Sequence, residues 1–393
     1  YPTMAWDQDS EQIYFWAQGK INKIDITDKQ VKQIPFTVNT ELAVQPAVRY
    51  EQNLDQDKFD VKMLRMAQVS PNGKMVVYEA LGKLWLKSLH DGKIKRLTKL
   101  KDNISELDPK WSRDGKYIVY STWNDQDQGS LKIVSVRNKR SKTITNEPGK
   151  YIEATFSPDG NKVVYRKAKG GYITPPEWSQ NPGFYVLDLD KEQPIKLSNQ
   201  GKQPQLGADN NRVYFIQQGK TPEFASINLT GFEKRVHYTS KHATEFRISP
   251  DGNQLAFAER FKVFVTPFAK HGETIDIGPK ANNLPITQLS VRAGESISWQ
   301  ANNKTLYWTL GPELYQVDID ANYQTKQADK PTITDIGFEQ SVDVPRGTIA
   351  FVGGQVITMD NDQVIADGVV VITDNKISAV GAKADVPIPS QSV

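Results

Sequence analysis

The feature that most constrains this chain is a turn motif that recurs along it. Ser-Pro-Asp-Gly, or a close variant, begins at Ser70, Ser112, Ser157 and Ser249. Pro fixes φ, Asp can bond its own backbone and Gly accepts a positive φ, so the motif reverses the chain between two antiparallel strands. The serines are 42, 45 and 92 residues apart, and the last spacing leaves room for one more copy. The chain is therefore built from repeats of 40 to 50 residues.

Three weaker copies complete the series. They begin at Ala5, Pro204 and Ser296, and the second has Ala-Asp-Asn-Asn in place of the motif. Each unit has the pattern of four short strands, which cannot bury both of their faces alone, whereas radial packing of such sheets buries them against one another. We therefore expect an all-β fold, a seven-bladed β-propeller of four-stranded blades in one closed ring, with residues 334–342 as the outer strand of the last blade.

These hairpins, with the strands that follow them, resemble the propeller repeats of TolB-like proteins and, more distantly, those of prolyl oligopeptidases. The resemblance covers about Ala5 to Asp320. It implies a propeller domain over residues 1–345, a protein or peptide partner, and a periplasmic or otherwise extracytoplasmic location. The chain opens at Tyr1 in mid-repeat without a signal-like segment, so we expect a cut end, with any targeting segment upstream.

The chain changes character in its last 48 residues, 346–393. Phe351–Met359, Gly368–Asp374 and Lys376–Gly381 have the pattern of three short strands, with a tight turn at Asp374 and Asn375. We expect them to begin a β-sandwich. Their order resembles the N-terminal end of amidohydrolases of the imidazolonepropionase-like superfamily, in which a metal-binding His-x-His follows soon after. The resemblance implies a larger parent enzyme that uses zinc or another divalent metal to hydrolyse a C–N bond, with its catalytic domain missing from this chain.

The chain itself offers no catalytic constellation. It has four His and no Cys, and it contains no His-x-His, His-Glu-x-x-His or Gly-x-Ser-x-Gly. We therefore expect no catalytic residue, cofactor or metal ligand here, and an inactive chain when it is isolated. The net charge of +3 is small, its basic clusters fit solvated outer strands, and no run of 18 apolar residues occurs. Neither nucleic-acid binding nor membrane insertion is expected.

Long insertions between strands suggest one candidate contact surface. They cover residues 38–64, 122–130 and 167–183, and all three fall on the face opposite the turn motifs. Long loops rich in Gly, Pro and aromatic residues often carry function, so Tyr172, Trp178 and Phe184 are the candidates for contact with a partner or with the missing catalytic domain. The alternative is that they cap the edge of a blade.

Three functions remain open at this point. The main interpretation is the propeller portion of a larger bacterial amidohydrolase, acting in substrate gating, partner binding or scaffolding. The first alternative is a stand-alone TolB-like protein-interaction module, in which the terminal strands serve only as a docking sheet. The second is the propeller of a prolyl-oligopeptidase-like peptidase, whose catalytic domain would lie outside this chain.

Overall fold

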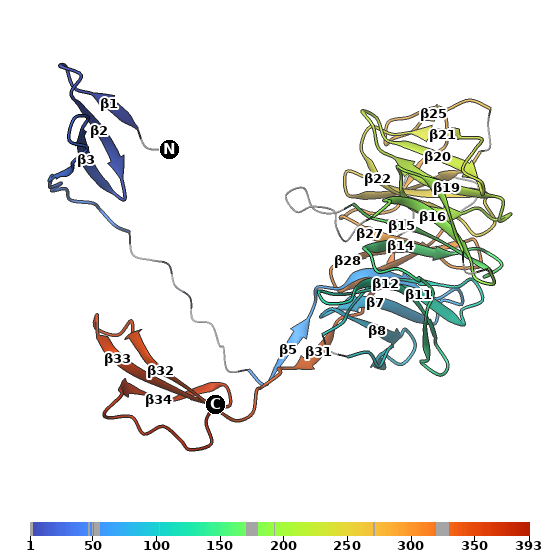
Figure 1. Ribbon diagram of the computed structural model, residues 1–393. Helices are drawn as coiled ribbons and strands as arrows, with labels where there is room; N and C mark the ends of the chain where they lie inside the picture. Colours follow the sequence, from blue (N-terminus) through green and yellow to red (C-terminus); the bar gives the residue numbers. More distant parts are fainter. Residues whose placement is uncertain are drawn as a thin grey trace. The chain divides into compact units, whose positions relative to one another are not determined.

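The structure is a computed structural model that describes residues 3–45, 48, 50, 56–101, 103–169, 180–191, 193–269, 272–319 and 330–393. The chain divides into two compact units, Tyr1–Asp55 and Gln56–Val393. Figure 1 labels the strands, which are the only regular elements among these residues. This part of the chain contains no helix long and apolar enough to cross a membrane.

Each of the seven repeats forms a sheet with four antiparallel strands. The N-terminal unit holds the first sheet, which consists of β1 (Met4–Trp6), β2 (Gln12–Ala17), β3 (Lys20–Asp25) and β4 (Val31–Ile34). The second sheet is β6 (Arg65–Val69), β7 (Met75–Ala80), β8 (Lys83–Ser88) and β9 (Ile94–Arg96), and the third is β10 (Ser105–Trp111), β11 (Tyr117–Asn124), β12 (Gln128–Ser135) and β13 (Ser141–Thr143). The fourth is β14 (Tyr151–Phe156), β15 (Lys162–Lys167), β16 (Gly183–Asp188) and β17 (Pro194–Ser198).

The remaining repeats follow the same order. The fifth sheet is β18 (Lys202–Leu206), β19 (Arg212–Gln217), β20 (Glu223–Asn228) and β21 (Arg235–Thr239), to which β25 (Ile275–Asp276) adds in parallel. The sixth is β22 (Ala243–Ile248), β23 (Gln254–Glu259), β24 (Lys262–Pro267) and β26 (Thr287–Gln288). The seventh is β27 (Glu295–Trp299), β28 (Thr305–Leu310), β29 (Glu313–Asp318) and β30 (Thr332–Asp335). The prediction of an all-β fold with seven four-stranded repeats is confirmed.

The turn motif owes its geometry to its serine as well as to Pro, Asp and Gly. In the third sheet the Ser112 hydroxyl donates to Asp114 Oδ1 at 2.6 Å and accepts the N–H of Tyr117 at 3.0 Å. The corresponding bonds occur in the other three Ser-Pro-Asp-Gly or Ser-Pro-Asn-Gly turns. Asn210 and Asn303 take the left-handed position of the glycine in the fifth and seventh copies, with φ of 59° and 60°, a conformation that Asn tolerates.

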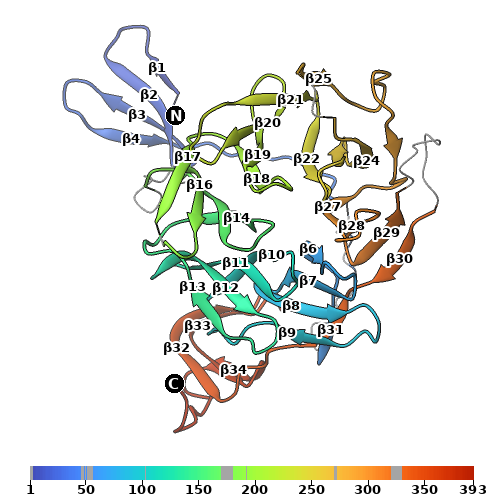
Figure 2. The ribbon, with the colours of Figure 1, turned by 90° about the vertical axis from the view of Figure 1, so that its right-hand side faces the viewer.

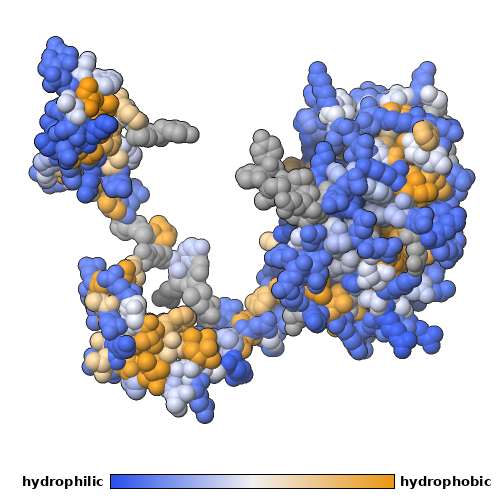
Figure 3. Space-filling model, in the orientation of Figure 1, coloured by the Kyte–Doolittle hydropathy of each residue, from blue (hydrophilic) through white to orange (hydrophobic). Residues whose placement is uncertain are grey.

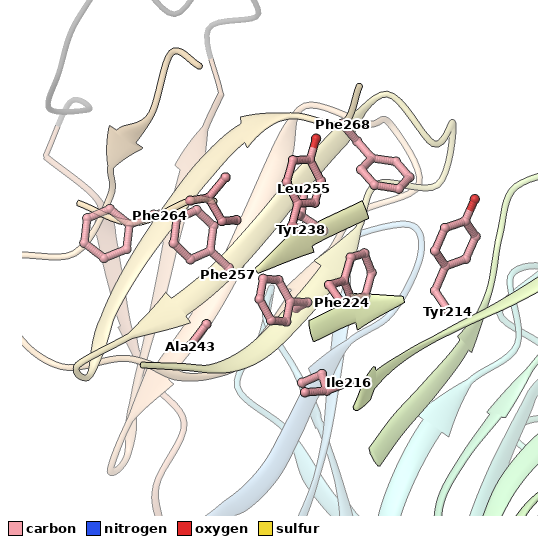
Figure 4. Packing of buried hydrophobic residues seen from close by; sticks show 11 residues of the cluster. Tyr214, Ile216, Phe224, Tyr238, Ala243, Leu255, Phe257, Phe264 and Phe268 are labelled. Atoms are coloured by element: carbon pink, nitrogen blue, oxygen red, sulfur yellow. The ribbon is translucent and has the colours of Figure 1, made fainter. Parts of the chain in front are cut away.

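Six of the sheets form a ring within the C-terminal unit. Figure 2 shows them following one another around a common axis, with β6, β10, β14, β18, β22 and β27 innermost. Alternate side chains of each strand face the two neighbouring sheets, so both faces of the middle strands are buried. Figure 4 shows such a layer, in which Phe224, Phe257 and Phe264 stack between the fifth and sixth sheets.

The ring closes where the second sheet meets the seventh. Val76 and Tyr78 of β7 share one buried cluster with Tyr307 and Leu314 of the seventh sheet. The Tyr78 hydroxyl donates to the Ile336 carbonyl at 2.9 Å. All seven repeats were expected in one ring, but these contacts close it with six sheets, and the first sheet belongs to the other compact unit.

A strand pair joins the beginning and the end of this ring. β5 (Lys58–Val61) pairs antiparallel with β31 (Phe338–Ser341). The expected outer strand at 334–342 is therefore split: its first residues end β30, and the next strand leaves the blade to pair with β5.

The C-terminal segment forms the three strands expected from its sequence. They are β32 (Thr348–Ile357), β33 (Val364–Thr373) and β34 (Lys376–Ala382), paired in that order. Asp374 has a φ of 55° in the turn between the last two. In Figure 3, hydrophobic side chains gather on the surface of this sheet. A second sheet of a β-sandwich does not occur among the residues that the structure describes, and the domain boundary at 345/346 stays a prediction.

Candidate binding site at the propeller axis

A cavity of about 270 Å³ lies where the six inner strands and their turns converge. Every sheet of the ring contributes to its lining, through Gln68, Trp111, Glu153, Gln205, Arg247 and Trp299. Pro71, Pro158 and Pro250 of the turn motifs also line it, so the cavity opens on the face of the turns and not on the face of the long insertions.

A bulge in the inner strands turns polar side chains toward this axis. Asp108, Glu153 and Gln203 have positive φ values of 50°, 57° and 51° at equivalent positions of successive sheets. A left-handed conformation is strained for such residues and persists only where the surroundings hold it. Here the next sheet does so, since Asp108 accepts the N–H of Glu153 at 2.5 Å and Glu153 accepts that of Gln203 at 2.7 Å.

These acidic groups are also neutralised by cations. Both carboxylate oxygens of Glu153 accept bonds of 2.8 Å from Arg166, and Lys110 lies 3.6 Å from Asp108. Arg247 pairs with Glu245 at 3.0 Å. Each of these ion pairs lies within one sheet, whereas the N–H bonds to Asp108 and Glu153 join neighbouring sheets. None of these contacts sets a nucleophile beside a base.

Arg113 lies at the mouth of the cavity, in the position that Pro occupies in the other copies of the turn motif. Its guanidinium donates to the Pro250 carbonyl at 3.0 Å. The two residues belong to the turns of the third and sixth sheets, on opposite sides of the ring, so this bond spans the mouth. Burial lowers the pKa of Arg113 from its usual value, against a smaller raising effect of Asp251.

Two tryptophans anchor neighbouring sheets beside the same axis. Trp111 donates its indole N–H to the Gln68 carbonyl, and Trp299 donates to the Arg247 carbonyl, both at 3.0 Å. In each case the acceptor lies on the inner strand of the sheet that precedes the tryptophan in the chain. Aromatic, proline and amide groups thus surround the cavity.

Of the three residues chosen from the sequence, Phe184 is described and does not line this cavity. Phe184 is fully buried and packs on Phe215 with 4.8 Å between ring centroids, so its side chain is core and offers no contact surface. Tyr172 and Trp178 lie outside the described residues, and a contact surface there stays a prediction. A second cavity of about 280 Å³ does lie at the two ends of that insertion, where Lys167, Asn181 and Tyr185 line it.

Sequence reasoning missed the axial site because it ranked loops by length. The signal that could have found it is the single Arg in the Pro position of the turn motif, at Arg113, together with Trp directly before the turn in three copies, two of them in the ring. His237 is buried, with its Nε2 2.8 Å from the Ser226 hydroxyl. No cluster of three potential metal ligands occurs in the part of the chain that the structure covers.

Comparisons with known proteins agree with this architecture. A family model described as the TolB beta propeller domain matches residues 59–263. The Tol-Pal system protein TolB of Francisella tularensis subsp. mediasiatica (strain FSC147) is 24% identical over 283 residues, which are 69% of this chain and 62% of that protein. The chain thus spans about three fifths of the length of this curated relative.

Two solved structures are similar at lower identity. A crystal structure of TolB from Acinetobacter baumannii is 16% identical with a TM-score of 0.47, covering 81% of this chain and 76% of that one. An oligogalacturonate lyase from Vibrio parahaemolyticus is 10% identical with a TM-score of 0.46, covering 81% and 89%. Because the family model matches more than half of the 393 residues, the chain belongs to the TolB β-propeller domain family.

Proposed function

We propose that this chain is a protein-interaction module that takes an extended segment of a partner protein at the axial cavity. The observation that carries the proposal is the convergence of all six ring sheets on one cavity with Arg113 spanning its mouth. A guanidinium that now bonds a carbonyl of its own chain can transfer its donors to a carbonyl or carboxylate of a partner. The pyrrolidine rings and indoles around it supply apolar contact for the partner's side chains.

The relatives support the class of partner and the location. They are named as proteins of the Tol-Pal system, and a place in a protein assembly of that kind is part of the proposal, as is an extracytoplasmic location. Protein binding needs neither metal nor cofactor, so none is assigned to this chain.

The test uses peptides selected from a random 12-residue display library on the purified chain. Affinities of the selected peptides are then measured for the wild type, for Arg113→Ala and for Arg137→Ala, an exposed arginine outside the cavity lining. Loss of a charge-assisted hydrogen bond costs about 1.5 to 3 kcal/mol, so Arg113→Ala should weaken binding at least tenfold. The Arg137→Ala control removes the same charge and should leave the affinity unchanged.

Hydrogen exchange on the complex locates the peptide. Protection of the inner strands and turns around the axis supports the proposal. Peptides that protect the ends of the 167–183 insertion instead, and that bind Arg113→Ala as well as the wild type, would move the site to the surface around Tyr172 and Trp178.

The second candidate is the propeller portion of an amidohydrolase, and one observation favours it. The sheet β32–β34 leaves Ile349, Phe351 and Val380 about half exposed on one face, and an apolar sheet face of this kind is the half of a β-sandwich that was expected. None of the relatives and structures named above is an amidohydrolase. The codons after Val393 decide the matter: a His-x-His within several dozen codons supports the enzyme, and its absence leaves the binding module.

A further inference from the structure

The first sheet has the side-chain pattern of a propeller blade without neighbours. The register places Met4, Trp6, Phe15 and Val31 on one of its faces. Trp16, Ile21 and Ile34 lie on the other. A sheet that faces water on one side alternates apolar with polar residues, whereas this one carries large apolar side chains on both sides, as the buried sheets of the ring do. Figure 3 shows hydrophobic residues at the surface of this N-terminal unit.

Trp6 has the same place in its repeat as the two indole anchors of the ring. Trp6 comes directly before Asp7, whose N–H bonds the Gln12 carbonyl at 3.0 Å. Trp111 comes directly before Ser112, whose N–H bonds the Tyr117 carbonyl at 2.8 Å, and Trp299 precedes Gln300 in the same way. The local backbone is thus alike in the three copies, but their surroundings differ. Trp111 is 7% exposed and donates to the preceding sheet, while Trp6 is 58% exposed.

The seam of the six-sheet ring is itself closed by buried side chains and main-chain bonds. At the seam, Val76 and Tyr78 of the second sheet are fully buried, and Tyr307 and Leu314 of the seventh, in the same cluster, are only 2% and 4% exposed. Main-chain bonding crosses the seam as well, from the Ala301 N–H to the Pro71 carbonyl at 3.0 Å. Insertion of another sheet there would break this cluster and these bonds.

We propose that β1–β4 is a blade of a second propeller, and that its Trp6 face packs on a sheet of the same repeat encoded directly before Met4 in the same gene product. The direction follows from the ring, where the acceptor of each indole lies on the sheet immediately preceding in the chain. The carbonyls that accept these indole bonds belong to Gln68 and Arg247. Each of these residues stands two positions before the first turn residue of its own sheet, Ser70 or Ser249. The partner sheet should therefore present a carbonyl to Trp6 two residues before a Ser or Asp turn. This inference is independent of the function proposed for the axial cavity.

The experiment compares Tyr1–Val393 with the gene product extended by its upstream codons, using hydroxyl-radical footprinting read by mass spectrometry. In Tyr1–Val393, Trp6 should be oxidised about eightfold faster than Trp111, the ratio of their exposures of 58% and 7%. In the extended protein its rate should fall to that of Trp111. Phe261, which is highly exposed in a hairpin of the ring, should react equally in both and serves as the internal control.

Two variants separate the indole bond from simple burial. In the extended protein, Trp6→Phe should lower the melting temperature of the upstream propeller by removing the N–H donor, and Trp6→Ala should lower it further. In Tyr1–Val393 both variants should leave the melting temperature of the ring unchanged. The proposal is overturned if no repeat of this kind is encoded in the roughly 50 codons before Tyr1, a length set by one repeat, or if Trp6 stays as reactive in the extended protein as in Tyr1–Val393.

Discussion

Because the ring closes with six sheets, we expect Tyr78→Phe to lower the free energy of unfolding. The side chain is fully buried, and its hydroxyl donates across the seam to the Ile336 carbonyl, which is also fully buried. The substitution keeps the aromatic ring and its packing against Phe338, 6.4 Å away between centroids, so the hydrophobic contribution is preserved. What is lost is one hydrogen bond, and a buried carbonyl is left without this donor. Such a loss costs about 1 to 3 kcal/mol of unfolding free energy.

Tyr120→Phe is the matched control. Tyr120 is equally buried, but its hydroxyl bonds Ser141 of the same sheet at 3.0 Å, and exposed Ser141 can turn to water instead. Its cost should lie near the lower limit for a hydrogen bond, about 0.5 kcal/mol. The assay is urea unfolding at pH 7 followed by tryptophan fluorescence, with the m-value expected to stay constant. If Tyr78→Phe costs no more than Tyr120→Phe, the seam between the second and seventh sheets does not hold the ring closed.

Four other outcomes are expected. Trp111→Ala should destabilise the ring by about 3 to 5 kcal/mol in the same urea assay, because it empties a core site, whereas an exposed tryptophan such as Trp6 should be neutral there. Deletion of residues 1–55 should leave the melting temperature of the ring unchanged by calorimetry, since the six sheets close without them. Burial raises the pKa of Tyr151 to about 12 and that of Tyr165 still further. Above pH 10 the unfolded chain therefore loses the phenol protons more readily than the folded chain does. Calorimetry should show the free energy of unfolding falling as pH rises from 10 toward 12, by about 1.4 kcal/mol per pH unit for each tyrosine. Addition of EDTA should leave the melting temperature of Tyr1–Val393 unchanged.

The repeats could be predicted from the sequence because each one is determined by interactions between residues that lie close together in the chain. A turn of Pro, Asp and Gly forms wherever it occurs, and the bond from Ser157 holds the pKa of Asp159 below its usual range in the folded turn. Strand order within a blade follows from such hairpins, since consecutive strands pair. The same holds for the C-terminal segment, in which Asp374 marks the last hairpin.

The number of sheets in the ring could not be predicted in this way. It depends on which sheet packs against which, and the first repeat has the same local pattern as the others. The difference becomes visible only through contacts between residues more than 200 positions apart, such as Tyr78 with Ile336. The axial site could not be predicted for the same reason, because Arg113 meets Pro250 only once the turns of opposite sheets face one another.

The strand pair at the ring's ends bears on how such a module works in a longer chain. Lys58 is the Cα partner of Ser341, and an ion pair of 2.8 Å between Lys58 and Glu339 lies on the same two strands. The chain therefore enters and leaves the ring side by side, with about 280 residues of propeller between two neighbouring positions. An element whose ends lie together can be placed between other domains without disturbing either, as for inserted domains in general. The segments on both sides of the ring can then fold independently of it, as the proposed role of a binding module within a longer protein requires.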